Sequence, residues 1–301
     1  MFLSGNTLSI LAFILWGLIP LYFQFIPDAN IIELLAIRVI IAIPLMLLLI
    51  KFVSKNLQKV LPALKNKKIL FMCFLAGGVN CLSLYSMTWA LTNGHVLAVS
   101  LGYFINPIFS IILGVLFFKD RLSLAQKIAV FLSICGISYQ VGFYGELPWL
   151  SLIMGSAFAL YGLIKKYILL DPLTATLIEL ICLIPIAVMA IIMGIINQQS
   201  ALYLHDWDTL MWYIGAVPVT LIPLILFSMA VGRTSLTMIG LTQYIEPSLQ
   251  FLLAILVFGE LLAQVKLISF SCIWLGLVLC TLEAFVQKRK MHWRTKNAPA
   301  P

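Results

Sequence analysis

Long apolar segments follow one another along the whole 301-residue chain, and short polar segments separate them. An apolar segment of about 18 or more residues is typical of a transmembrane helix, since roughly 20 residues at 1.5 Å each cross the hydrocarbon core of a bilayer. No polar segment is long enough to fold separately. The pattern predicts ten spans, at residues 8–26, 33–52, 69–91, 97–118, 125–143, 149–165, 174–196, 210–231, 236–258 and 264–286.

Prolines occur inside several predicted spans. A proline removes one backbone hydrogen bond from a helix, and neighbouring helices in a membrane can satisfy the carbonyl that is freed. We therefore keep these segments as spans although they contain Pro44, Pro107, Pro185, Pro218, Pro223 and Pro247.

Composition supports the same interpretation. Hydrophobic residues make up 62% of the chain and charged residues 10%, with a mean hydropathy of +1.09. A soluble domain of this size needs more polar residues to cover its surface. The sequence therefore predicts an all-α membrane protein whose surroundings are the lipid bilayer.

The basic residues indicate how the chain is oriented. With the N-terminus in the cytoplasm, every Lys and Arg except Arg38 and Lys266 falls on a cytoplasmic connection or on the C-terminal tail; Lys165 and Lys166 are among them. Cytoplasmic connections of membrane proteins are enriched in Lys and Arg. We expect both termini in the cytoplasm, a location in the inner membrane, and no nucleic-acid partner despite the net charge of +8.

The two halves of the chain match each other. Tyr103-Phe-Ile-Asn-Pro107 in the fourth span corresponds to Gln243-Tyr-Ile-Glu-Pro247 in the ninth, at an offset of 140 residues, and Gly136 corresponds to Gly276 at the same offset. The second and seventh spans match at an offset of 141, which places Arg38 opposite Glu179.

The first and sixth spans complete this pattern, with Trp16-Gly-Leu-Ile19 corresponding to Tyr161-Gly-Leu-Ile164. Each half contains five spans, so the second half enters the membrane in the opposite direction and forms an inverted repeat. We expect a first five-helix repeat at 1–145, a second at 146–286 and a basic cytoplasmic tail at 287–301.

Three of the charged residues in the predicted spans lie about five or more residues from either end: Arg38, Glu179 and Glu246. Each costs about 2.5–3.5 kcal/mol near the bilayer centre unless a partner or a water-filled cavity compensates it. Arg38 and Glu179 lie at mirrored depths, so we expect them on two sides of a central cavity rather than in a direct ion pair. Arg38 could bind an anionic group through its planar donor fork or bond loop carbonyls. Glu179 could be a coupling or gating carboxylate or a helix–helix hydrogen-bond partner.

Glu246 lies close to the membrane midplane, where apolar surroundings favour a neutral carboxyl. It is either a proton carrier or a protonated group bonded to a neighbouring helix. The candidate substrate-binding residues are Arg38, Asn80, Tyr103, Asn106, Glu179, Gln243 and Tyr244. Glu246 is the candidate for proton coupling, and Trp16, Tyr85 and Tyr161 are further lining candidates for which helix packing is the alternative.

No metal, cofactor or disulfide framework is expected. The six cysteines lie in apolar runs without a CxxC spacing, and the three histidines are scattered outside the mid-membrane regions.

These residues resemble the drug/metabolite transporter superfamily, in its ten-helix EamA group and most closely the RarD type. The matching motifs are Trp16-Gly-x-x-Pro20-x-Tyr-Phe23, Glu33-x4-Arg38, Ser100-Leu-Gly-Tyr-Phe-Ile-Asn-Pro107 and Gln243-Tyr-Ile-x-Pro247. The resemblance implies transport of small metabolites or drugs across the cytoplasmic membrane. At position 246 the family more often has a small residue, so a role for Glu246 is argued from physical chemistry alone.

We therefore predict a secondary transporter that works by alternating access, with proton coupling and exchange both open. The chain contains no G-x-x-x-x-G-K-[ST] phosphate loop, so ATP is not the expected direct energy source. The alternatives are a channel or receptor and, less favoured, an intramembrane enzyme, which would need a nucleophile–base pair or a metal cluster at membrane depth. The residues specify neither the substrate nor the oligomeric state.

Overall fold

The computed structural model describes residues 3–26, 30–54, 57–92, 96–144, 149–201, 203–204, 206–257, 259 and 264–296. These residues form helices and their connections, and no strand occurs among them. The helices are α1 (Gly5–Leu18), α2 (Pro20–Phe23), α3 (Ile31–Leu49), the π-helical turn η1 (Ile50–Ser54), the 3-10 turn η2 (Leu57–Lys59), α4 (Val60–Lys65), α5 (Lys67–Thr92), α6 (Val96–Phe118), α7 (Leu124–Tyr144), α8 (Trp149–Tyr167), α9 (Pro172–Ile196), α10 (Trp207–Val231), α11 (Leu236–Gln243), α12 (Ile245–Leu256) and α13 (Gln264–Lys296).

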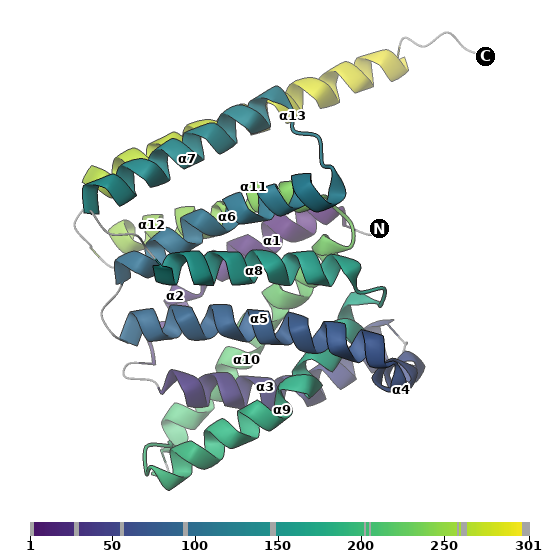
Figure 1. Cartoon of the computed structure of the whole chain (residues 1–301), viewed down its shortest axis with the longest axis vertical. Coiled ribbons are helices and arrows are strands. Elements are labelled where there is room, and N and C mark those ends of the chain that lie inside the picture. The colour runs from purple at the N-terminus through teal and green to yellow at the C-terminus, as the bar shows by residue number, and fades with distance from the viewer. Residues whose placement is uncertain are drawn as a thin grey trace.

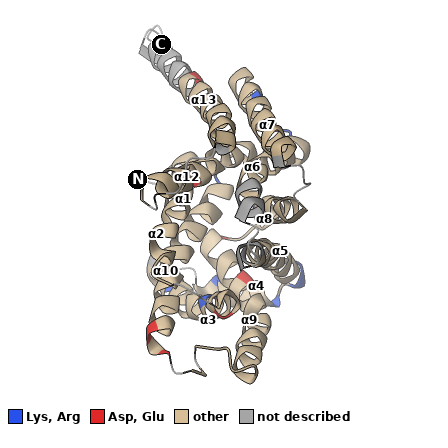
Figure 2. Ribbon diagram, turned by 90° about the vertical axis from the view of Figure 1, so that its left-hand side faces the viewer, with Lys and Arg blue, Asp and Glu red and all other residues tan. Residues whose placement is uncertain are grey.

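Seven helical stretches in the described part of the chain are long and apolar enough to cross a membrane: Gly5–Phe23, Ile31–Phe52, Lys67–Met87, Leu124–Phe143, Pro172–Ile196, Trp207–Val231 and Leu236–Leu256. Two shorter apolar stretches are Gly102–Phe118 and Leu267–Glu283. Charged residues are few along the helices (Figure 2). The prediction of an all-α membrane protein that crosses the bilayer several times is confirmed.

The helices lie side by side, and their long axes run in roughly the same direction (Figure 1). α7 and α13 pack together at one edge of the molecule, and α3 and α9 pack together at the opposite edge. The N-terminus, the C-terminus and α4 lie at the same end of the helices (Figure 1). Helix α4 and the turn before it carry Lys59 and Lys65, so this end is rich in positive charge.

The helices of the two halves can be paired in chain order, α1 with α8, α3 with α9, α5 with α10, α6 with α11 and α12, and α7 with α13. Helix α6 packs on α8, and α11 and α12 pack on α1. Helix α5 packs on α8 and α9, and α10 packs on α1 and α3. Each of these contacts is thus accompanied by its equivalent with the two halves exchanged.

Helices α7 and α13 make two equivalent close contacts, each between a glycine of one helix and a small residue of the other. A β-carbon added at Gly136 would lie 3.0 Å from the Ser269 carbonyl oxygen, and one added at Gly276 would lie 2.8 Å from the Ala129 Cα. Gly276 follows Gly136 by 140 residues, and Ser269 follows Ala129 by the same number. Small residues at both crossings let the two backbones approach closely, as is common between membrane helices.

Two helices are interrupted near a proline. The chain breaks between α1 and α2 at Ile19, and Pro20 begins the new helix. The predicted ninth span is two helices, α11 and α12, which meet at Tyr244, and Pro247 lies in the first turn of α12. Proline lacks an N–H group, and first-turn N–H groups have no partner inside their own helix, so proline fits there without loss. Pro107, the equivalent of Pro247, lies inside the continuous helix α6.

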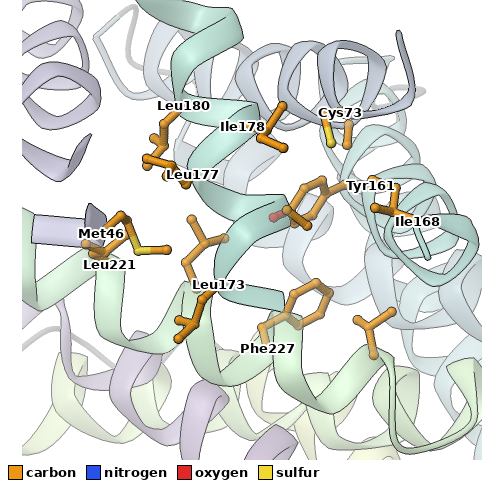
Figure 3. Packing of buried hydrophobic residues seen from close by; sticks show 14 of the residues in the cluster. Met46, Cys73, Tyr161, Ile168, Leu173, Leu177, Ile178, Leu180, Leu221 and Phe227 are labelled. Carbon is orange, nitrogen blue, oxygen red and sulfur yellow. The ribbon is translucent and has the colours of Figure 1, made fainter. Parts of the chain in front are cut away.

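A core of buried apolar side chains joins α3, α8, α9 and α10 (Figure 3). At its centre the rings of Tyr161 and Phe227 stack with centroids 5.8 Å apart. Phe158 and Trp16 extend this aromatic cluster toward α1, with ring centroids 5.7 Å apart. Because lipid is as apolar as these side chains, close packing rather than water exclusion stabilises such a core.

The α7–α13 contact gives a test of the packing. We expect Gly276→Ala to destabilise the protein by about 1–3 kcal/mol, because the new methyl group overlaps the α7 backbone. Gly142→Ala on α7 is the matched control, since a β-carbon there meets no atom within 4 Å. Thermal unfolding of the purified protein in detergent measures both variants. Equal melting temperatures for the two would contradict this packing.

Candidate functional site

A small cavity lies between α3, α5 and α9, and α10 closes one side of it. Its polar lining comes from Arg38, Asn80, Thr176 and Glu179. The remaining lining is mostly apolar: Leu35, Val39, Gly77, Cys81, Leu84, Leu180, Leu183 and Leu224. The cavity therefore combines helices of both halves and contains groups of both charge signs.

Glu179 is held by two side chains of α8. The Lys165 ammonium donates to Glu179 Oε1 at 2.7 Å, and the Tyr161 hydroxyl donates to Oε2 at 3.1 Å. The two charged side chains are 3% and 6% exposed, so this is a buried ion pair. Lys165 also donates to Thr176 Oγ1 at 2.9 Å. The pair ties α8 to α9 and leaves each carboxylate oxygen of Glu179 with a donor.

The position of Lys165 corrects one sequence-based expectation. We expected both Lys165 and Lys166 on a cytoplasmic connection, but α8 continues to Tyr167 and Lys165 is buried. The reason is helical spacing: Lys165 follows Tyr161 by four residues and shares its inward face, where the Glu179 carboxylate compensates its charge. Lys166 points elsewhere and donates to the Thr234 carbonyl at 2.5 Å. The four-residue spacing from Tyr161 was the signal that could have identified Lys165.

Arg38 lines the cavity on α3. Across the described part of the chain, its guanidinium makes neither a hydrogen bond nor an ion pair. Among the ionisable groups, the Tyr161 hydroxyl and the Cys81 thiol interact electrostatically with it. Arg38 and Glu179 therefore line one cavity, and within the described residues no ion pair joins them.

A second polar group surrounds Glu246. Gln250, one turn further along α12, donates to Glu246 Oε1 at 3.4 Å. Tyr103 of α6 lies within electrostatic range of Glu246 and donates from its hydroxyl to the Met87 sulfur at 3.0 Å. Met87 follows Asn80 by seven residues on α5, so the same face of that helix lines the cavity and then reaches Tyr103.

The other candidates from α6 and α11 do not line this cavity. Asn106 Oδ1 and Gln243 Oε1 are buried without a hydrogen-bond partner among the described residues, as is the Tyr244 hydroxyl. Tyr244 packs with Phe104 and other aromatic residues toward α13. All three belong to the elements where α6 meets α11 and α12.

The further lining candidates lie outside this cavity. Tyr85 is 50% exposed on α5. Trp16 belongs to the aromatic cluster of the core. Tyr161 is fully buried, and its hydroxyl donates to Glu179 of the cavity lining. Trp16 and Tyr161 thus pack in the core, whereas Tyr85 is half-exposed.

Comparisons with known proteins fit this architecture. Residues 3–140 match the EamA-like transporter family. "Protein RarD" of Salmonella typhi is 34% identical over 287 residues, which cover 95% of this chain and 97% of that protein. The chain belongs to the EamA-like transporter family, in its RarD branch. The resemblance inferred from the motifs is thereby confirmed.

A further relative supports the membership of this RarD-type chain, and a solved structure resembles its fold. An "uncharacterized transporter" of Pseudomonas aeruginosa is 33% identical, with 95% of this chain and 96% of that protein covered. A protein of known crystal structure is 12% identical and superposes with a TM-score of 0.69, covering 92% of this chain and 98% of that chain. At that identity the second similarity shows a common fold alone.

The buried ion pair of the RarD-type chain gives a second test. Lys165→Met should destabilise the protein by about 3–5 kcal/mol, because it leaves a buried carboxylate without its counter-ion. Glu179→Gln should also destabilise, and the double variant should lose less than the sum of the two single effects. Melting temperatures in detergent give the coupling, and Lys166→Met is the neighbouring control. Additive effects would show that the two charges do not interact.

Proposed function

We propose that the chain is a secondary active transporter that carries a small metabolite, amino-acid-like compound or drug across the cytoplasmic membrane by alternating access. The observation that carries this proposal is the charged cavity between α3, α5 and α9, to which both halves of a family-typical transporter fold contribute. A membrane protein has little reason to keep Arg38 and Glu179 in its interior unless they stabilise or bind something.

The proposed architecture is ten transmembrane helices in two inverted repeats, at 1–145 and 146–286, followed by a basic tail at 287–301. Its support is the reciprocal packing of α7 with α13 and of the inner helices. An inverted repeat gives a transporter two related conformations, because each half can adopt the arrangement of the other.

Contacts at both ends of the α3–α9 pair are suitable as gates. At the end where α3 begins, the buried Glu33 carboxylate accepts from Ser200 Oγ at 2.5 Å and from the Ala201 N–H at 2.9 Å. Nearer the end where α9 begins, the Lys165–Glu179 pair joins α9 to α8. In the proposed cycle these two sets of contacts open alternately, so the cavity is never open to both sides.

The proposed orientation places both termini in the cytoplasm. Its support is the common end of the helices at which α1 begins, α13 ends and α4 with Lys65 lies (Figure 1). A green fluorescent protein fused after the C-terminus should fluoresce, and alkaline phosphatase fused there should be inactive. Alkaline phosphatase inserted between α7 and α8, after five spans, should be active. The reverse pattern would contradict the orientation and the odd number of spans in the first half.

Glu246 is the proposed site of proton coupling. In proteoliposomes that contain the purified protein, an imposed pH gradient should drive saturable flux of a substrate found in a panel of radiolabelled amino acids, organic acids and nucleosides. Glu246→Gln should abolish the response to the gradient, because an amide cannot release a proton. Glu283→Gln is the matched control, since Glu283 accepts a hydrogen bond from Ser123 and is not among the polar residues around Glu246. Flux that ignores the gradient in both the wild type and Glu246→Gln would refute proton coupling through Glu246.

A further inference from the structure

The charges around the cavity do not cancel. Lys165 and Glu179 form a closed pair, because the ammonium lies 2.7 Å from the carboxylate and Tyr161 occupies the second oxygen. Arg38 lines the same cavity and makes no ion pair with any described residue. The described cavity residues together with Lys165 therefore carry one net positive charge, on the guanidinium of Arg38.

The other acidic side chains within these helices are engaged elsewhere. Glu33, on the same helix as Arg38, accepts hydrogen bonds from Ser200 and Ala201, which follow the end of α9. Glu246 belongs to α12 and bonds Gln250. Within the described residues, neither carboxylate forms a hydrogen bond or an ion pair with Arg38. In the described part of the chain, no carboxylate therefore forms an ion pair with Arg38, and Glu179, which lines the same cavity, is paired with Lys165.

An uncompensated guanidinium in an apolar site is costly, and the cost falls when an anion binds. A guanidinium binds a carboxylate through two parallel N–H···O bonds, which are among the strongest polar contacts in proteins. The walls around Arg38 are largely leucine and valine, including Leu35, Val39 and Leu84. They suit an apolar body attached to the carboxylate rather than a small hydrated anion.

We infer that the cavity binds a small organic anion, with its carboxylate on Arg38 and its apolar body among the leucines. This inference rests on the proposed transport function and names its substrate class. Lys165 acts as a specificity residue that does not touch the substrate: by neutralising Glu179 it removes the site that would otherwise bind an ammonium group. A cationic drug would meet the charge of Arg38, and an α-amino acid would have to displace Lys165 from Glu179.

The test uses full-length protein in lipid nanodiscs and the probes benzoate, 3-phenylpropionate and hexanoate, each with its neutral primary amide and its amine analogue. The carboxylates should raise the melting temperature of the wild type in a concentration-dependent way, because a ligand that binds only the folded state stabilises it. The amides and amines should have little effect. Arg38→Gln should weaken carboxylate binding by about tenfold or more, which is 1.4 kcal/mol per factor of ten.

Three variants sharpen this comparison. Arg38→Lys keeps the charge without the donor fork and should bind carboxylates with intermediate affinity. Arg121→Gln removes a charge from an exposed arginine and should leave binding unchanged. Lys165→Met frees Glu179 and should shift the preference from 3-phenylpropionate toward phenylalanine, which carries an ammonium group.

The result that would overturn the inference is wild-type stabilisation by amides or amines as strong as by carboxylates, or equal carboxylate binding by the wild type and Arg38→Gln. The acid–amide comparison needs only the wild type, so a variant that fails to fold does not prevent the test. Saturable proteoliposome flux restricted to neutral or cationic solutes would refute the anion site and leave the transporter intact. Carboxylate binding without flux of any probe would refute transport and leave the anion site intact.

Discussion

An ionised carboxylate inside a membrane protein needs a counter-ion, and the buried pair of Lys165 and Glu179 satisfies that requirement at the meeting point of α8 and α9. Tyr161 holds the second carboxylate oxygen and stacks on Phe227, so the ion pair is continuous with the aromatic core. The hydrogen bonds of Tyr161 and Lys165 to Glu179 therefore join α8 to α9 within an apolar core. Removing either charge would leave the other buried and unpaired, which is the costly case.

The same pair determines what the cavity can recognise. Glu179 would attract cations if it were unpaired, but its charge is cancelled within the protein. Arg38 is left as the charged group that a ligand can neutralise, and most of the remaining lining is leucine, with Asn80 and Thr176 as neutral polar side chains. Our proposal of an organic anion follows from this balance rather than from the fold, because one fold can host sites of different chemistry.

Much of the architecture could be predicted from the sequence. Apolar length is enough to locate helices, and the 140-residue offset that relates Gly136 to Gly276 reappears as a reciprocal contact between α7 and α13. Arg38 and Glu179 were identified because charged residues are rare within apolar runs. The direction in which each side chain points was harder to predict, since the offset aligns positions along two helices but does not specify which neighbouring helix each side chain contacts. Tyr244 was therefore expected in a cavity, whereas it packs toward α13.

Lys165 was misplaced because its basic neighbour and its position after an apolar run make it look like a loop residue. Its four-residue spacing from Tyr161 indicates the inward face, but the partner that compensates its charge lies on another helix. The break between α11 and α12 was missed for a related reason. Pro107 and Pro247 occupy equivalent positions in the sequence, but one lies inside a helix and the other in a first turn. Local sequence does not decide between these outcomes, because neighbouring helices determine which backbone bonds are satisfied.

The uncompensated charge of Arg38 can be measured through Cys81, which lines the same cavity and lies within electrostatic range of Arg38. In a variant that keeps only this cysteine, anionic and cationic methanethiosulfonate reagents of similar size report the local potential through the ratio of their reaction rates. The account predicts that the ratio favours the anionic reagent and falls several-fold in Arg38→Gln. A ratio that favours the cationic reagent, or one that Arg38→Gln leaves unchanged, would contradict it.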